Sequence, residues 1–211
     1  MRIADFGDEY AVCFDGASER RVLVIPALFD EANKLRRFTL SVMRALHVAG
    51  IFSVLPDWPG CNESRALLRE QTLSGWREAA SAAARRFEAT EVLAIRGGAL
   101  LAPADLPLVG YAPVTGSTIL RGLLRSAVIS AREAGDEITR DALLGRGLTH
   151  GLVLAGHCLS AEMLAELEAA EPAASARIIA QSELGGPALW LRAEPGDDPA
   201  QTARLAALVA G

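Results

Sequence analysis

Lysine, histidine and cysteine are scarce in this chain. Lys34 is the only lysine among 21 basic residues, so a Schiff-base or phosphate-binding lysine is excluded from every other position. Cys13, Cys61 and Cys158 are an odd number, lie far apart and lack the short spacing of a zinc site or a redox pair. We therefore expect packed, unpaired thiols, no metal site and no cofactor.

Long apolar runs are also missing. No stretch approaches the roughly 18 consecutive apolar residues of a membrane-spanning helix, and Asp5 lies where a signal peptide needs an apolar run. We therefore expect a cytoplasmic protein without a membrane span. The net charge of −5 opposes binding to a phosphate backbone, so nucleic acid is not an expected partner. The dominance of arginine over lysine, with abundant alanine, is typical of bacteria with GC-rich genomes.

Short apolar runs alternate with amphipathic segments in the first half of the chain. The apolar runs are residues 22–25, 51–55, 92–95 and 108–111. Apolar residues at helical spacing predict helices at 31–49, 72–87 and 117–133. Continuous apolar strands between such helices are typical of an α/β protein whose mostly parallel sheet has helices on both faces.

The second half is expected to add a helical cap and to complete the sheet. Residues 116–150 are predicted to form the cap over the carboxyl edge of the sheet. Further predicted elements are a strand at 152–155, a helix at 161–170, strands at 177–180 and 188–192, and a final helix after the N-cap Asp198. With 211 residues, 51% of them apolar, the whole chain 1–211 is expected to be one domain.

Residues that follow the predicted strands are the candidates for a binding site. Ligands of an open parallel sheet bind at the carboxyl ends of its strands. The pocket candidates are Leu28, Phe29 and Asp30 after the first strand, Asp57, Trp58 and Cys61 after the second, Arg96 with Gly97 and Gly98 after the third, and Glu183 after a later strand.

The order of these segments resembles that of the α/β-hydrolase fold. In that fold a sharp Gly-x-Ser-x-Gly turn, the nucleophile elbow, follows a strand and needs small residues beside the nucleophile. Residues 94–98 (AIRGG) occupy that place, with Arg96 at the position of the nucleophile. The resemblance implies an α/β-hydrolase-like fold with a helical cap.

A closer resemblance is to the second type of hydrolase-like protein associated with bacterial exosortase systems. The segments that carry it are PALFDEANKLRR (26–37), LPDWPG (55–60), IRGGALL (95–101), APVTG (112–116), AGHCLS (155–160) and WLRAEPGDDP (190–199). This resemblance implies a link to an exosortase or exopolysaccharide gene cluster.

The usual Ser-His-acid residues are missing from their expected positions. The elbow holds Arg96 in place of serine, and no histidine follows the last predicted strand. The three histidines are His47, His150 and His157, and candidates for the acid are Glu183, Glu194, Asp197 and Asp198. Whether the chain is an enzyme is therefore left open.

Other combinations of reactive residues are also weak. Cys158 follows His157 on an extended segment, where neighbouring side chains point to opposite sides, so the two are not expected to touch. Cys61 is expected near the pocket, mainly as a packing residue. His150 and His157 lack a third ligand for a metal, and the glycines at 145 and 147 lack the strand-to-helix context of a dinucleotide loop.

Arg96 has three interpretations. In the first, Arg96 pairs with Asp30, Asp57 or Glu183 and closes the former active site. In the second, it binds a carboxylate, phosphate or anionic sugar, and in the third it takes part in catalysis. A guanidinium at a strand end needs a partner in each case. Because the strand ends converge, we expect Arg96, Asp57 and residues 26–31 to share one pocket with a locally positive potential.

Two classes of function remain. The first is a degenerate hydrolase-like protein that binds a small anionic ligand or assembles, for example as a homodimer, in connection with an exosortase or exopolysaccharide system. The alternative is an atypical hydrolase or acyl transferase that acts on an ester or thioester.

Overall fold

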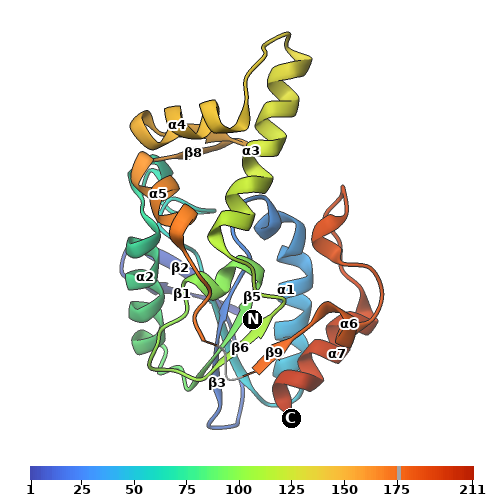
Figure 1. The fold of residues 1–211 in the computed structure, drawn as a ribbon. Coiled ribbons are helices and arrows are strands. Elements are labelled where there is room, and N and C mark those ends of the chain that lie inside the picture. The colour runs from blue at the N-terminus through green and yellow to red at the C-terminus, as the bar shows by residue number, and fades with distance from the viewer. Residues whose placement is uncertain (175–176) are drawn as a thin grey trace.

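The computed structural model describes residues 1–174 and 177–211, and within them a seven-stranded sheet forms the centre of the molecule (Figure 1). The strands are β1 (Arg2–Phe6), β2 (Glu9–Phe14), β3 (Arg21–Ile25), β4 (Phe52–Pro56), β5 (Glu91–Ile95), β6 (Leu108–Tyr111) and β9 (Arg177–Ile179). Their spatial order is β1-β2-β4-β3-β5-β6-β9. The strands from β4 to β9 are parallel, whereas β1 and β2 pair in antiparallel fashion and β2 joins β4 antiparallel.

Helices cover both faces of this sheet. One face packs against α1 (Asp30–Val48), α6 (Gln181–Leu184) and α7 (Pro199–Ala210), and the other against α2 (Leu73–Arg86). Side chains of β3 alternate between the two cores, with Leu23 in one core and Val22 and Val24 in the other. All three are fully buried, which explains why a continuous apolar run forms this strand.

Several helix ends lie where the sequence predicts them. The Thr72 side chain accepts a hydrogen bond from the Gly75 N–H at 3.0 Å and caps α2. Asp198 caps α7 in the same way, by accepting from the N–H groups of Ala200 and Gln201. Such caps satisfy backbone donors that a helix leaves unpaired at its first turn.

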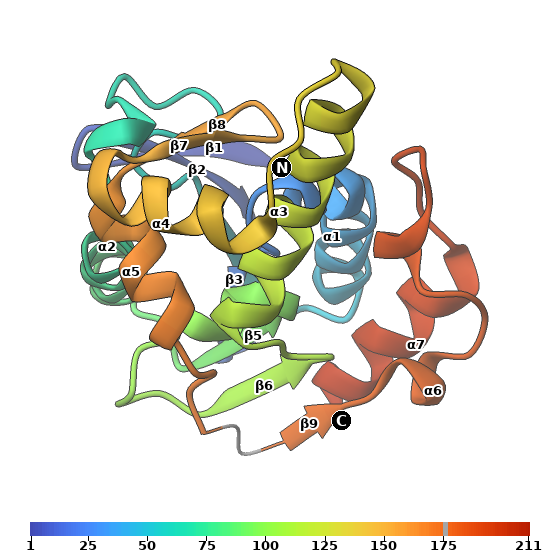
Figure 2. The same cartoon turned by 45° about the horizontal axis from the view of Figure 1, so that its top comes forward.

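Between β6 and β9 the chain leaves the sheet and forms a layer over one end of it (Figures 1 and 2). This layer contains α3 (Gly116–Glu133), α4 (Arg140–His150), the hairpin of β7 (Leu152–Leu154) and β8 (His157–Leu159), and α5 (Ala161–Ala169). The strand predicted at 152–155 therefore belongs to a separate two-stranded sheet. The layer also continues beyond residue 150, where the predicted cap ends.

Two further differences concern the termini. The sequence analysis did not predict β1 and β2, because their polar residues interrupt the apolar pattern of a strand. The strand predicted at 188–192 is wrong, because Leu189–Leu191 form a turn of 3-10 helix, η3. The other 3-10 turns are η1 (Leu68–Glu70) and η2 (Arg96–Leu100). Among the described residues, every helix is too short or too polar to cross a membrane.

Glu166 fastens α5 to the start of α2. Its carboxylate accepts hydrogen bonds from the Ser74 N–H at 3.0 Å and the Ser74 hydroxyl at 2.6 Å. Burial alone would raise the pKa of Glu166, but hydrogen bonds from Ser74 and from the Leu73 N–H lower it below its usual value. The negative charge also lies at the positive end of the α2 dipole.

We expect Glu166→Gln to lower the free energy of unfolding by about 1 kcal/mol at pH 7, because the charged partner of the α2 terminus is lost. The folded-state pKa lies below the unfolded one, so this stabilisation is present above the unfolded pKa and is lost as pH falls through the folded pKa. Urea unfolding of both proteins between pH 7 and about pH 3 should therefore show a difference that is constant down to the ordinary pKa of glutamate and shrinks below it. Glu168→Gln, an exposed change on the same helix, is the control. A difference that stays constant with pH would contradict the assignment.

Candidate functional site

The chain turns sharply where β5 ends, at the predicted elbow. Arg96 has a φ of +54°, a region that non-glycine residues rarely adopt and that costs about 1–3 kcal/mol. A Cβ on Gly98 would lie 2.5 Å from the carbonyl oxygens of Ile25 and Pro26, so only glycine allows β3 to approach this turn. The predicted strand-to-helix turn is confirmed, although the helix that follows is the short 3-10 turn η2.

The Arg96 side chain is held on several sides. Its Nε and Nη2 donate to the two carboxylate oxygens of Glu31 at 2.9 and 3.0 Å, and its Nη1 donates to the Ala112 carbonyl at 3.0 Å. The guanidinium carbon also lies 4.0 Å from the centre of the Trp190 ring. Only 11% of the side chain is exposed. A bidentate carboxylate and a stacked aromatic ring together fix the guanidinium over the elbow.

The partner of Arg96 is therefore Glu31, and not Asp30 or Glu183 as the sequence analysis considered. Asp30 pairs with Lys34 across one turn of α1, at 2.8 Å. Glu183 accepts a hydrogen bond from the N–H of Ala180 at the start of α6. Glu31 reaches Arg96 because α1 starts directly after β3, which is the neighbour of β5 in the sheet.

Asp57, the third acid considered for Arg96, faces other groups. It accepts a hydrogen bond from Asn62 Nδ2 at 2.5 Å and lies 3.9 Å from the Arg36 guanidinium. Burial raises the pKa of Asp57, while Asn62 and Arg36 oppose that shift. Asp57 and Arg96 thus have separate partners.

Two adjacent pockets replace the single pocket that we expected. The elbow pocket has a volume of about 280 Å³ and lies between the elbow and α3. It is lined by Leu28, Phe29, Asp30, Glu31, Lys34, Arg96, Val114, Thr118, Ile119, Gly122, Leu123, Ser126, Ala155 and Trp190. Its two cations, Lys34 and Arg96, are each paired with an acid, so the charges do not give the positive potential that we predicted.

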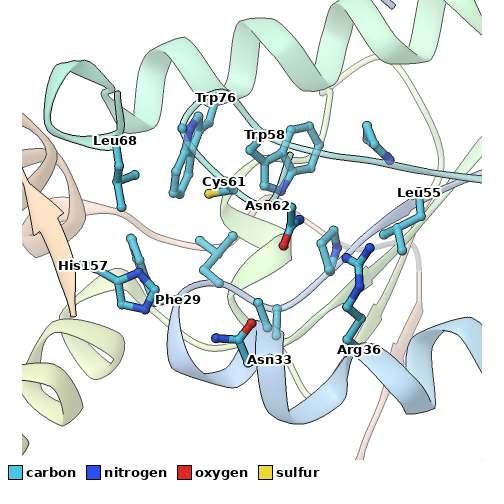
Figure 3. Close-up of a pocket in the computed structure, with 16 residues that line it drawn as sticks. Phe29, Asn33, Arg36, Leu55, Trp58, Cys61, Asn62, Leu68, Trp76 and His157 are labelled. Atoms are coloured by element: carbon cyan, nitrogen blue, oxygen red, sulfur yellow. The ribbon is translucent and has the colours of Figure 1, made fainter. Parts of the chain in front are cut away.

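The tryptophan pocket lies over the ends of β3 and β4 and has a volume of about 210 Å³ (Figure 3). It is lined by Pro26, Ala27, Leu28, Phe29, Ala32, Asn33, Arg36, Leu55, Pro56, Trp58, Gly60, Cys61, Asn62, Leu68, Trp76 and His157. Leu28 and Phe29 contribute to both pockets. Of the other predicted site residues, Trp58 and Cys61 line the tryptophan pocket and Asp30 and Arg96 the elbow pocket, whereas Asp57 and Glu183 are not among the described linings.

Hydrogen bonds hold the loop that forms one wall of the tryptophan pocket. The Trp76 indole N–H donates to the Pro59 carbonyl at 2.9 Å. The Ser64 hydroxyl accepts from the Gly60 N–H and donates to Glu9. Gly60 has a φ of +82°, and a Cβ there would lie 2.6 Å from the Cα of Leu68. The loop is therefore built into one conformation before any ligand arrives.

Cys61, a predicted pocket residue, shares this pocket with His157, which the sequence analysis did not place there. Burial raises the pKa of the Cys61 thiol to about 12, and the charges of Asp57 and Glu9 add to that shift. Burial lowers the pKa of His157. At neutral pH the thiol is therefore protonated and the imidazole uncharged, which makes Cys61 a poor nucleophile.

Cys158 and His157 differ in exposure, as expected for neighbours on a strand. His157 is half-buried and packs its ring against Phe29 at a centroid distance of 5.5 Å, whereas Cys158 is exposed. The signal that could have found His157 is the alternation of the β7–β8 hairpin, because one of each pair of neighbours must face inward. The described residues contain no group of three potential metal ligands.

No protein-family model matches the chain, and no curated protein is similar to it in sequence. Among solved structures it is similar to alpha/beta hydrolase domain-containing protein 10 from mouse, with a TM-score of 0.54 and 14% identity over 99% of this chain and 96% of that one. It is also similar to Est1E from Butyrivibrio proteoclasticus, solved with ferulic acid bound, with a TM-score of 0.53 and 14% identity over 80% and 70% of the two chains. A hydrolase from Agrobacterium vitis matches over 52% of its own length, at 18% identity and a TM-score of 0.44.

The chain therefore has the α/β-hydrolase fold, with a mostly parallel central sheet and flanking helices, as its sequence predicts. Sequence identities of this size show the fold alone.

A double-mutant cycle should detect the Arg96–Glu31 pair. We expect Arg96→Ala to lower the free energy of unfolding by about 2 kcal/mol, because it leaves the partly buried Glu31 carboxylate without its partner. The double variant with Glu31→Ala should lose at least 1 kcal/mol less than the two single losses together. The control cycle on the more exposed Lys34–Asp30 pair should give a coupling below about 1 kcal/mol. Equal coupling in the two cycles would show that Arg96 and Glu31 do not act as a buried pair.

Proposed function

We propose that this protein is a non-catalytic member of the α/β-hydrolase fold that binds a ligand or a partner and does not turn over a substrate. The observation that carries the proposal is the Arg96 guanidinium, held by Glu31, Ala112 and Trp190 where a hydrolase of this fold has its nucleophile. A guanidinium remains protonated in proteins, so it offers neither a nucleophilic lone pair nor a general base.

The surroundings of Arg96 support the same conclusion. A serine hydrolase needs an imidazole in hydrogen-bonding reach of its nucleophile. His157 lines the tryptophan pocket, and the described lining of the elbow pocket contains no histidine. The Glu31 carboxylate is the group at the elbow that could most readily serve as a general base. Both of its oxygens already accept hydrogen bonds from Arg96.

The biological setting is part of the proposal. The resemblance to exosortase-associated hydrolase-like proteins supports a role in a bacterial exosortase or exopolysaccharide system, in the cytoplasm. We further propose that residues 1–211 act as one domain with residues 116–150 as its cap, and that the protein binds a small anionic ligand or forms a homodimer. The position of α3 along the elbow pocket supports the assignment of the cap.

A second candidate, an atypical hydrolase or acyl transferase, is favoured by one observation. Cys61 and His157 line the same pocket, so His157 could take the thiol proton while the sulfur attacks an ester or thioester. The leaving alcohol or thiol would then take that proton back from His157. Burial and the nearby acids that raise the thiol pKa oppose this step, so we rank this candidate second.

Hydrolysis assays separate the two candidates. With short-chain nitrophenyl esters and acyl thioesters, we expect the purified protein to release product no faster than an equal concentration of free cysteine and imidazole. Arg96→Ser should not restore turnover, because a serine hydrolase needs an imidazole in reach of its nucleophile and the described lining of the elbow pocket contains no histidine. Turnover that disappears in Cys61→Ala and in His157→Asn, but persists in the exposed control Cys158→Ala, would overturn the proposal in favour of the second candidate.

A further inference from the structure

We propose that the tryptophan pocket binds a small aromatic carboxylate. Its ring would lie between the aromatic walls, and its carboxylate would face the indole N–H of Trp58 and the guanidinium of Arg36. This inference rests on the proposed binding function and names the site and the chemical class of its ligand. The elbow pocket plays no part in it.

The first observation is a contrast between two tryptophans of the pocket. Trp76 donates its indole N–H to the Pro59 carbonyl at 2.9 Å. Trp58 is 3% exposed, and its Nε1 has no hydrogen-bond partner among the described residues. A buried donor without an acceptor costs about 1–3 kcal/mol. A ligand that accepts a hydrogen bond from this N–H would recover that energy, so the pocket favours a ligand with an acceptor.

The second observation is the set of polar groups at the edge of the pocket. Asn33 and Arg36 lie three residues apart on α1 and therefore share one side of the helix. Figure 3 shows both side chains reaching toward the pocket from α1, opposite Trp58 and Trp76. Arg36 has Asp57 as its ionic partner among the described residues, at the long distance of 3.9 Å. A guanidinium in such a loose pair can still bind a carboxylate.

The apolar walls and the volume define the rest of the ligand. The Phe29 ring lies 5.5 Å from the rings of both Trp76 and His157, measured between centroids, so three aromatic rings make a continuous surface. Aromatic surfaces of this kind favour stacked or edge-to-face contacts with another ring. A volume of about 210 Å³ is below the usual range for drug-sized ligands, about 300–1,000 Å³. The pocket therefore suits a ligand of one ring.

The acids near the pocket do not cancel this preference for an acceptor. Asp57 accepts from Asn62 and one oxygen of Glu9 accepts from Ser64, whereas the buried Oε2 of Glu9 has no partner among the described residues. Neither acid is among the residues described as lining the pocket. Besides the donors of Trp58 and Arg36, the lining offers the amides of Asn33 and Asn62 and the imidazole of His157, which can donate as well as accept.

Benzoate, benzamide and toluene are probes of equal ring size that separate charge, hydrogen bonding and apolar contact. The indole N–H signals of Trp58, Trp76 and Trp190 can be followed by ¹⁵N–¹H NMR and assigned with single Trp→Phe variants. We expect benzoate to bind with the highest affinity and to move the Trp58 indole signal downfield, as a new hydrogen bond would. Benzamide should give a smaller affinity and a similar shift, and toluene should give no downfield shift.

Three variants make the proposal falsifiable. Trp58→Phe should weaken benzoate binding about tenfold, because it removes the donor and keeps a ring of similar shape. The matched control Trp190→Phe, in the elbow pocket, should leave benzoate affinity unchanged. Arg36→Gln should weaken benzoate about threefold to fivefold and leave benzamide unaffected. Unchanged signals of Trp76 and Trp190 in Trp58→Phe and Arg36→Gln, and of Trp58 and Trp76 in Trp190→Phe, would show that each variant is folded.

No benzoate binding at millimolar concentration would overturn the inference, as would benzoate binding that Trp58→Phe does not weaken. Toluene binding as tightly as benzoate would also overturn it, since the pocket would then select apolar contact alone. None of these outcomes bears on the proposed lack of catalysis, which the ester and thioester assays test separately.

Discussion

The structure depends on one constraint, the close approach of β3 to the turn after β5. This approach requires glycine at position 98 and places residue 96 at a positive φ. A serine in this conformation would be an exposed nucleophile, whereas an arginine must find partners for a charge that it cannot lose. Glu31, in the first turn of the helix that follows β3, is close for the same reason, because β3 and β5 are neighbours. The geometry that makes the elbow sharp therefore also provides the ion pair that covers it.

The Arg96–Glu31 pair lies in one of two adjacent pockets at the carboxyl edge of the sheet. The two pockets share the side chains of Leu28 and Phe29. Phe29 has a positive φ of 55° where β3 passes into α1, and its ring meets Trp76 in the tryptophan pocket. One pocket is thus lined by matched charges, and the other by aromatic rings with a donor that has no partner among the described residues. A nucleophile at the elbow would act in the first pocket, whereas the proposed ligand would occupy the second.

Hydrophobic periodicity predicted most of the fold. Buried parallel strands and one-sided helices leave strong patterns, so β3 to β6, α1, α2 and α3 were found, and the caps at Thr72 and Asp198 marked two helix starts correctly. Strands β1 and β2 were missed because both carry polar residues among their apolar ones; β1 is the edge strand, and β2 lies between β1 and β4. Residues 188–192 are apolar because Leu189 and Trp190 pack against α1 and Arg96, so their apolar character came from packing and not from a strand. The site was predicted as a set of strand ends, and spacing could also have selected Glu31 over Asp30, because Glu31 lies four and seven residues before Leu35 and Phe38 on the buried stripe of α1.

The chemistry of the tryptophan pocket follows from which polar groups have partners. Burial raises the pKa values of Glu9 and Asp57, and each carboxyl group is held by a donor from the loop, Ser64 or Asn62. These acids help to keep the Cys61 thiol protonated, which disfavours covalent chemistry in the pocket. They also accept hydrogen bonds from Asn62 and Ser64, which would otherwise be free to donate to a ligand. Trp58 and Arg36 line the cavity and keep donors for a ligand, because Trp58 Nε1 has no partner among the described residues and Arg36 has only a long ionic contact. A ligand that brings acceptors would pair with both. The same buried acids thus oppose the enzymatic interpretation and support the binding one.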